Sequence, residues 1–170
     1  MAACDRFPIR GATMSDAVRV FDLIDDAKTF FKANGIDMWQ RGYPQFVDIA
    51  DDISSGNAYV CTNGDLVVGY VFVTFEEEDF HSTLEGKWED DDPAVFHRII
   101  VDPDYRHCGI GKELISFAED LAKDKGCTSM RTETDVTNTP MTSLMAELGY
   151  SERGPLIFKD FQKLAFEKLF

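Results

Sequence analysis

The chain passes from an apolar, β-branched run into an amphipathic segment through a loop with two glycines one residue apart. The run is "AVFHRIIV", from Ala94 to Val101, and the loop "DPDYRHCGIG" follows it directly. Residues 111–125 then carry apolar side chains at helical spacing, and Gly126 ends them. This order predicts a strand and then a loop that opens a helix. The backbone N–H groups at such a helix start are free to bind an anion.

Two better-known phosphate-binding loops do not match. A P-loop requires a first glycine where Arg106 stands, and Ser or Thr where Glu113 stands. A dinucleotide-binding loop accepts Gly109 and Gly111, but it requires a third small residue at the position of Leu114. The loop therefore does not indicate binding of a nucleoside triphosphate or a dinucleotide. On the loop alone, a glycine-rich turn without a ligand stays open as an alternative.

Length and charge restrict the class of protein. A chain of 170 residues predicts a single domain over residues 1–170. The net charge of −14 argues against a nucleic-acid partner, because phosphate binding needs clustered Lys and Arg. An acidic surface favours a cationic acceptor such as an amine, although acidity often reflects solubility alone.

The cysteines are too widely spaced for a metal or redox motif. They stand at Cys4, Cys61, Cys108 and Cys127, without a CxxC pair, so no metal is expected. The N-terminus "MAACDRFPIRGA" has no apolar core of a signal peptide, and no stretch approaches 18 apolar residues. We therefore expect no membrane partner and a cytoplasmic protein with reduced thiols.

Periodicity gives the remaining elements. Strands are expected at 6–12, 57–63, 66–78, 94–101, 128–135, 150–158 and 162–170, and helices at 16–33 with Ser15 as N-cap, 45–54, 111–125 and 138–149. The acidic stretch 76–93 is expected to be a long loop, which in compact domains is usually functional or mobile. This order indicates an α/β fold with a mixed sheet and no domain boundary.

The chain resembles the GNAT superfamily of acyl-CoA-dependent N-acetyltransferases. The segment "RHCGIG" matches the family's Arg/Gln-x-x-Gly-x-Gly/Ala signature, and "IIVDPDY" matches its Val-x-Pro lead-in. Downstream, "NTPMTSLMAELGY" is similar to the helix that follows the fifth strand in the family. The resemblance covers the whole order of elements. It implies a mostly antiparallel, twisted α/β sheet of about six to seven strands, with a splayed central parallel pair and about four flanking helices.

The resemblance also implies where acetyl-CoA binds as co-substrate. The loop would hold the pyrophosphate, the strand before it would pair with the pantetheine arm, and Asn138 would bond the arm or an ordered water. A backbone N–H near Val101 could polarise the thioester carbonyl. The expected cofactor-binding residues are Ile99, Ile100, Val101, Arg106, His107, Cys108, Gly109, Ile110, Gly111, Lys112, Asn138 and Met141.

The amine must attack in its unprotonated form, so a base is expected. His97 is the first candidate, since strand alternation predicts that Val95, His97, Ile99 and Val101 share one face. Glu76, Glu77 and Glu78 are second candidates, and of these Glu76 is taken as catalytic. A core histidine and a solvated acidic run are the alternatives.

The acceptor is expected to contact Trp39, Tyr43 and Glu77, because aromatic and acidic groups suit a cationic amine. Ordinary packing of these aromatic residues is the alternative.

One position departs from the family pattern. Many members carry a general-acid Tyr directly after the Leu of the last helix, where this chain has Met145 after Leu144. Thiols ionise near a pKa of about 8.5, so an acid helps but is not essential. The expected activity is acetyl transfer from acetyl-CoA to a primary amine of a small molecule or peptide by direct attack. A catalytically weak acyl-CoA-binding or regulatory module is the alternative. Family members often dimerise, so a homodimer stays open beside a monomer.

Overall fold

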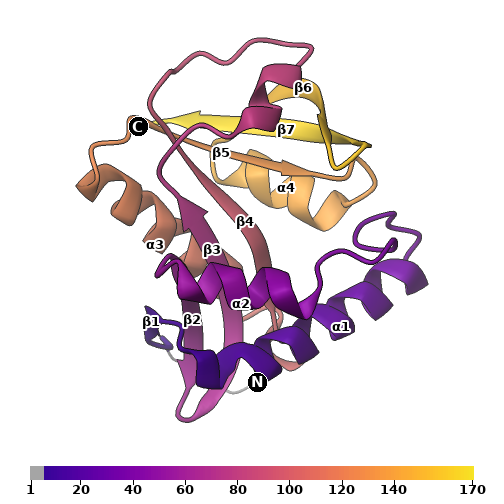
Figure 1. Ribbon diagram of the computed structural model, residues 1–170, viewed down its shortest axis with the longest axis vertical. Coiled ribbons are helices and arrows are strands. Elements are labelled where there is room, and N and C mark those ends of the chain that lie inside the picture. The colour runs from indigo at the N-terminus through magenta and orange to yellow at the C-terminus, as the bar shows by residue number, and fades with distance from the viewer. Residues whose placement is uncertain (1–5) are drawn as a thin grey trace.

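The computed structural model describes residues 6–170, which form one sheet of seven strands (Figure 1). The strands are β1 (Ile9–Gly11), β2 (Ala58–Asn63), β3 (Leu66–Thr74), β4 (Pro93–Val101), β5 (Ser129–Thr134), β6 (Ser151–Phe158) and β7 (Phe161–Leu169). They lie in the order β1-β2-β3-β4-β5-β7-β6, and only β4 and β5 pair in parallel. The predicted mixed, mostly antiparallel sheet is confirmed.

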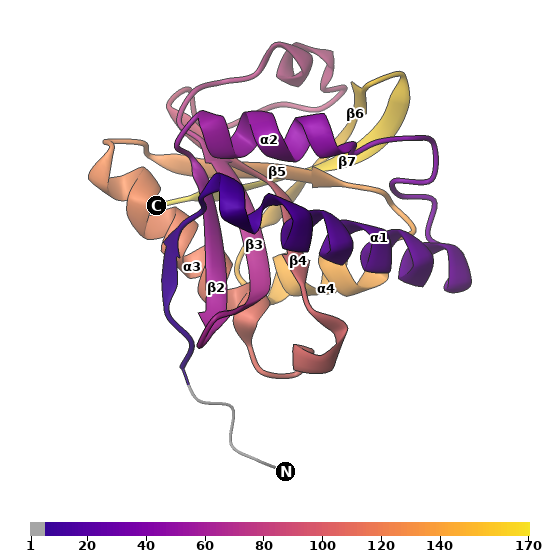
Figure 2. The same cartoon turned by 60° about the horizontal axis from the view of Figure 1, so that its bottom comes forward.

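Within residues 6–170, four α-helices cover the two faces of the sheet. They are α1 (Ala17–Ala33), α2 (Phe46–Ser54), α3 (Ile110–Asp124) and α4 (Thr139–Glu147). The first two lie on one face and the last two on the other (Figure 2). Each face has its own core cluster: one centres on α3, and the other joins α1 and α2 to β2 and β3. Three short 3₁₀ turns complete the fold: η1 (Met14–Asp16), η2 (Asp79–Thr83) and η3 (Pro103–Tyr105).

Two predicted boundaries differ from the structure. Ser15 is not an N-cap, since it lies inside η1, where Asp16 accepts a hydrogen bond from the Thr13 N–H at 2.8 Å. The predicted strand 66–78 stops at Thr74, which pairs with Val95 close to the start of β4. Glu76, Glu77 and Glu78 therefore belong to a connection that crosses the end of the sheet, and not to a strand.

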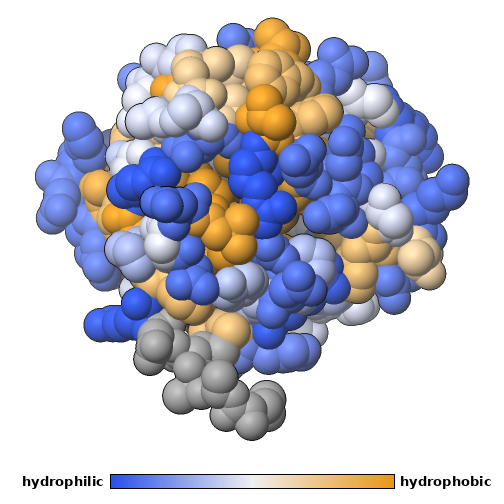
Figure 3. All heavy atoms as spheres, turned by 90° about the horizontal axis from the view of Figure 1, so that it is seen from below, coloured by the Kyte–Doolittle hydropathy of each residue, from blue (hydrophilic) through white to orange (hydrophobic). Residues whose placement is uncertain are grey.

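The surface carries exposed apolar side chains at scattered places. The face drawn in Figure 3 is mostly hydrophilic, with apolar residues in separate patches. No helix within residues 6–170 has the length and apolar character needed to cross a membrane.

Gly86 lets residues 75–92 between β3 and β4, the acidic connection, approach β6 at the edge of the sheet. A Cβ at this position would lie 1.9 Å from the carbonyl oxygen of Arg153 in β6. Next to it, the Glu85 N–H donates a hydrogen bond of 2.9 Å to the Pro155 carbonyl oxygen. A side chain at Gly86 would therefore meet backbone, which cannot turn aside as a side chain can.

Substitution Gly86→Ala is expected to push the connection off β6 and to lower the free energy of unfolding by about 1–3 kcal/mol, as overpacking does. Urea denaturation measures this loss. Gly11→Ala is the control, because a Cβ on Gly11 meets no heavy atom within 4 Å. Equal unfolding free energies for the two variants would contradict the contact.

Candidate active site

The parallel strands β4 and β5 separate soon after they meet. They pair only from Pro93 to Val95 and from Ser129 to Arg131, so the rest of β4 has no partner on that side among the described residues. A β-bulge accompanies the separation, since Phe72 pairs with His97 while Tyr70 pairs with Ile100. One residue of β3, Val71, thus faces two residues of β4, Arg98 and Ile99. Arg98 has a φ of 51°, which is in the left-handed region. The expected splay is therefore present, with a free backbone edge along β4.

The bulge overturns the predicted alternation of β4. Ile99 and Val101 pack against the core cluster on the α3 side. His97 lies beside Phe72, which packs against the α1 and α2 cluster on the opposite face. One extra residue shifts the phase of the strand, so His97 and Val101 do not share a face. Alternation counted along the sequence cannot detect this shift.

A cavity occupies the place where the two strands diverge. Its walls come from β4, β5, the α1–α2 loop, the start of α4 and the β6–β7 hairpin. Of the residues expected at the site, the lining includes Trp39, Tyr43, His97, Ile99, Asn138 and Met141. No residue of the acidic stretch 76–93 lines it. The structure thus brings the aromatic candidates together with His97 and leaves the acidic stretch outside.

The glycine loop ends in a helix start with free donors. Helix α3 begins at Ile110, and the Glu113 N–H donates to the Gly109 carbonyl oxygen at 3.1 Å. The N–H groups of residues 110–112 precede this bond, so they lack an intrahelical acceptor. Gly109 has a φ of 76°, and a Cβ on it would meet nothing within 4 Å. At Gly111 a Cβ would meet only Leu144 and Val101, at 3.8 and 4.0 Å. The loop therefore has the free donors and the open space that a pyrophosphate needs.

Other residues expected at the cofactor have partners within the protein. The Arg106 guanidinium lies 3.9 Å from the centre of the Phe30 ring, and Lys112 pairs with Glu147. His107 is exposed with a φ of 73°. Asn138 caps α4, where its side chain accepts from the Met141 N–H at 3.4 Å. The capping role that the sequence allowed for Asn138 is present.

The cysteines correct one expectation. Cys61 and Cys127 are free thiols, but Cys108 is disulfide-bonded, so the expected reduced state does not hold for it. Cys4 lies outside the described residues. Within residues 6–170, no group of three or more His, Cys, Asp and Glu side chains could hold a metal ion.

His97 is held between two carboxylates. Its Nε2 lies 2.7 Å from Glu78 Oε1 and its Nδ1 lies 2.9 Å from Glu133 Oε1. Burial alone would lower the pKa of His97, but the charges and hydrogen bonds of the two carboxylates outweigh it and raise the pKa to about 9. The imidazole is therefore protonated at neutral pH, and both ring nitrogens donate. The bond to His97 also lowers the pKa of Glu78, against its partial burial.

The bulge residue Arg98 organises a second ion pair beside the cavity. Its guanidinium donates through Nε and Nη2 to the two oxygens of Asp52 in α2, and through Nη1 to the Tyr43 hydroxyl. Burial raises the pKa of Tyr43 to about 12, although Arg98 opposes the shift. The Tyr43 hydroxyl therefore stays protonated and can donate a hydrogen bond to a ligand in the cavity.

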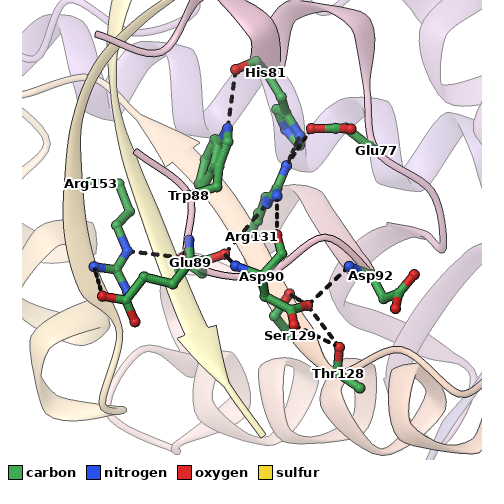
Figure 4. A network of polar contacts seen from close by, with 11 residues as sticks. Glu77, His81, Trp88, Glu89, Asp90, Asp92, Thr128, Ser129, Arg131 and Arg153 are labelled. Atoms are coloured by element: carbon green, nitrogen blue, oxygen red, sulfur yellow. Dashed lines mark hydrogen bonds and ion pairs between the residues drawn. The ribbon is translucent and has the colours of Figure 1, made fainter. Parts of the chain in front are cut away.

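The acidic connection packs around a buried arginine of β5 (Figure 4). Arg131 has only 1% of its side chain exposed, and it donates to Glu77 Oε1 at 3.0 Å and to the Asp90 carbonyl oxygen at 2.6 Å. Its guanidinium lies over the Trp88 ring at 4.0 Å. Glu76 is exposed, and Glu78 is the member of the acidic run that reaches His97.

Four residues at or beside the cavity were not expected from the sequence as parts of the site: Glu133, Arg98, Asp52 and Arg131. Asp52 carries a signal, because it occupies the apolar face of α2 between Ile49 and Ile53. Arg131 and Glu133 carry another, because charged residues in a short central strand need buried partners. Neither signal identifies the residue with which each of these charged side chains pairs.

Comparison with known proteins gives the family. A model of the acetyltransferase (GNAT) family matches residues 20–150. The chain belongs to this family of acetyltransferases. An uncharacterized N-acetyltransferase of Methanocaldococcus jannaschii is 29% identical over 140 residues, which is 78% of this chain and 58% of that protein. An aminoglycoside N(6')-acetyltransferase type 1 of Salmonella typhimurium is 34% identical over 70 residues, which is 41% of this chain and 48% of that enzyme. The chain thus spans about half the length of these curated relatives.

Solved structures show the same fold. An acetyltransferase of the GNAT family from Streptococcus agalactiae has a TM-score of 0.81 at 29% identity, over 96% of this chain and 95% of that chain. A PaiA N-acetyltransferase from Thermoplasma acidophilum, solved with coenzyme A, has a TM-score of 0.71 at 18% identity, over 96% and 99% of the two chains. At that identity the second similarity shows the fold alone.

Proposed function

We propose that this chain transfers an acetyl group from acetyl-CoA to a primary amine of a small molecule or peptide, by direct attack of the amine, in the cytoplasm. The observation that carries the proposal is the cavity between the diverging strands β4 and β5, since it adjoins both a free strand edge and the aromatic α1–α2 loop. A donor held along β4 would meet an acceptor that enters from the α1–α2 side. The coenzyme A complex of the PaiA enzyme and the aminoglycoside substrate named for the Salmonella relative support the two halves of this reaction.

The residues proposed to hold acetyl-CoA follow from the open space at the loop. The N–H groups of Ile110, Gly111 and Lys112 would face the pyrophosphate, with the partial positive charge of the α3 start behind them. The free edge of β4 around Ile99 to Val101 would pair with the pantetheine amides as an added strand. Acetyl-CoA supplies an activated acyl group when it is bound, and the chain supplies its orientation.

The acceptor is proposed to lie against Trp39 and Tyr43. Both line the cavity, and the Tyr43 hydroxyl can donate to an oxygen of the acceptor or of the acyl group. The predicted contact with Glu77 has no support from the lining of the cavity, because Glu77 pairs with Arg131 outside it.

A catalytically weak module that only binds acyl-CoA is the second candidate. Met145 is completely buried in the core cluster with α3, so no hydroxyl occupies the position of the family's usual acid. The Tyr150 hydroxyl donates to Glu119 at 2.8 Å and is also buried, so it does not replace that acid. Acetyl-CoA binding without turnover on any amine would favour this candidate.

The test of cofactor binding uses Gly111→Val. Its added methyl groups are expected to fill the space proposed for the pyrophosphate, so the rise in Tm that acetyl-CoA produces in the wild type should disappear. The Cβ itself would lie at ordinary contact distance from Leu144 and Val101, and the Tm without ligand shows whether the methyl groups disturb the fold. Gly11→Val is the matched control, since Gly11 lies in β1 outside the loop and a Cβ on it meets no heavy atom within 4 Å.

Release of free thiol with polyamines, aminoglycosides, amino acids and peptides then tests transfer. No rise in Tm at millimolar acetyl-CoA in the wild type would reject both the enzyme and the binding module. An unchanged rise in Gly111→Val would reject the proposed position of the pyrophosphate alone.

A further inference from the structure

We propose that Glu133 of β5 is the catalytic base that takes the proton from the acceptor ammonium, and that His97 is a positioning residue. This assignment rests on the proposed function, because it concerns the proton of the acceptor amine. It differs from the expectation drawn from the sequence, which placed the base at His97 or in the acidic run.

Glu133 has one oxygen engaged and one free. Its side chain lines the cavity, is 7% exposed, and accepts from His97 Nδ1 through Oε1. The second oxygen, Oε2, is buried and has no hydrogen-bond partner among the described residues. A buried carboxylate oxygen without a partner is costly for the protein and strongly favours a bound donor. An ammonium group in the cavity is such a donor.

His97 cannot serve as base in the same state. Both of its nitrogens donate, one to each carboxylate, so the protonated ring offers no lone pair to the amine. Its pKa of about 9 keeps this state at neutral pH. The ring instead holds Glu133 in place through Oε1. Oε2 of Glu133 then remains available to the acceptor. Glu78 holds the ring from the other side, and its side chain is 25% exposed.

The charges around Glu133 leave it attractive to a cation. His97 neutralises one of the two carboxylates that it contacts, so the three groups together carry one negative charge. The other groups close by are Arg131 two positions before Glu133 on β5, which pairs with carboxylates of its own, and His81 of η2, whose pKa burial lowers so that it stays neutral at pH 7. This cluster therefore presents a negative charge to an ammonium. The cations in the cavity lining are Arg41, Arg98, Lys159 and Lys163, and three of them pair with the carboxylates of Asp37, Asp52 and Asp135.

The rest of the cavity offers no equivalent group. Asp37 is the other carboxylate in its lining, but it is half exposed and pairs with Arg41 at 3.1 Å. Tyr43 keeps its proton at neutral pH. Glu76 and Glu77 do not line the cavity. Among the described residues, Glu133 is the buried carboxylate that the acceptor can reach.

Glu133 Oε2 takes one proton from R–NH₃⁺, and the freed nitrogen lone pair forms the C–N bond with the thioester carbonyl carbon. The C–S bond breaks, and its electron pair leaves with sulfur. The second nitrogen proton goes to that thiolate, which gives the amide and coenzyme A thiol. Glu133 then releases its proton to water when the products leave, so the reaction yields one proton in all.

The test is Glu133→Gln, which keeps the shape but cannot accept the proton. With the best amine of the panel, kcat at pH 7 is expected to fall about 10²- to 10⁴-fold, the usual contribution of a general base. The KM for acetyl-CoA should stay unchanged. The deficit should shrink as pH rises toward the pKa of the amine, about 10, because the solution then supplies unprotonated acceptor. A loss caused by distortion of the fold would not be repaired in this way.

The control is Glu119→Gln, which removes another buried carboxylate with two partners, Tyr150 and Lys168, in the core away from the cavity. It should leave kcat at pH 7 unchanged. A Glu133→Gln variant with wild-type kcat at pH 7, or with the same deficit at every pH, overturns the assignment and leaves the proposed function intact. A wild type that acetylates no amine of the panel overturns both, since Glu133 then has no proton to take.

Discussion

Replacing Arg131 with methionine is expected to lower the free energy of unfolding by about 3–5 kcal/mol, the usual cost of removing one partner of a buried ion pair. Arg131 is 1% exposed and Glu167 is completely buried, with 3.7 Å between Arg131 Nε and Glu167 Oε2. Methionine fills much of the volume but cannot balance that carboxylate. It also leaves the Asp90 carbonyl oxygen and Glu77 without the donor they share.

Part of this cost is offset by the other partners of Glu167. Arg153 Nε lies 3.0 Å from its Oε1, and the Glu89 N–H donates to the same oxygen at 2.9 Å. We therefore expect the protein to stay folded at low temperature and the acidic connection to loosen first. Urea denaturation gives the free energy, and hydrogen exchange at the Glu89 and Asp90 amides reports the loosening.

Arg41→Met is the matched control for Arg131→Met. Arg41 pairs with Asp37, but both side chains are more than half exposed, so the loss should stay below about 1 kcal/mol. If the two substitutions cost the same, the network in Figure 4 is not a stabilising element.

The Arg131 network also explains why Glu78 stands where it does. Glu77 forms an ion pair with Arg131, and the next residue, Glu78, forms one with His97. Loosening the acidic connection should therefore weaken the hold on His97 and, through it, on Glu133. In this way a contact outside the cavity supports a group inside it.

The fold could be predicted because its signals are local. The glycine loop after residues 94–101, the helical spacing of 111–125 and the asparagine that opens the last helix each depend on a few neighbouring residues. The splay of the central strands followed from the family resemblance and not from any residue pattern. The cavity lies where the strands diverge, and the α1–α2 loop with Trp39 and Tyr43 forms part of its wall. The same resemblance therefore allowed these two residues to be expected there.

The side-chain contacts could not be predicted in the same way. The bulge at Arg98 leaves no local mark, and it alone decides that His97 faces away from Ile99 and Val101. Glu133 meets His97 only because β5 lies beside β4 in the sheet, 36 positions apart in sequence. His97, which the sequence indicated as a base, lies between two carboxylates from distant segments, and these raise its pKa to about 9.

The stability of the protein is expected to depend on His97 as pH rises from neutral to alkaline. The pKa of His97 is raised in the folded state to about 9 from 6.5. A raised folded-state pKa contributes stability that is fully present below about 6.5 and is lost as pH rises through about 9. At about 1.4 kcal/mol for each pKa unit, the contribution is on the order of 3 kcal/mol. Above pH 9 the ring becomes neutral while Glu78 and Glu133 still face it.

His97→Gln isolates this contribution, because glutamine can donate to one carboxylate but carries no charge at any pH. The difference in unfolding free energy between wild type and variant should be largest near pH 6 and should fall by about 3 kcal/mol by pH 10. Groups that titrate alike in both proteins cancel in the difference. His107→Gln, at an exposed position of the glycine loop, is the control. A flat difference for His97→Gln would mean that the ring is not charged between its carboxylates, and it would restore His97 as a candidate base.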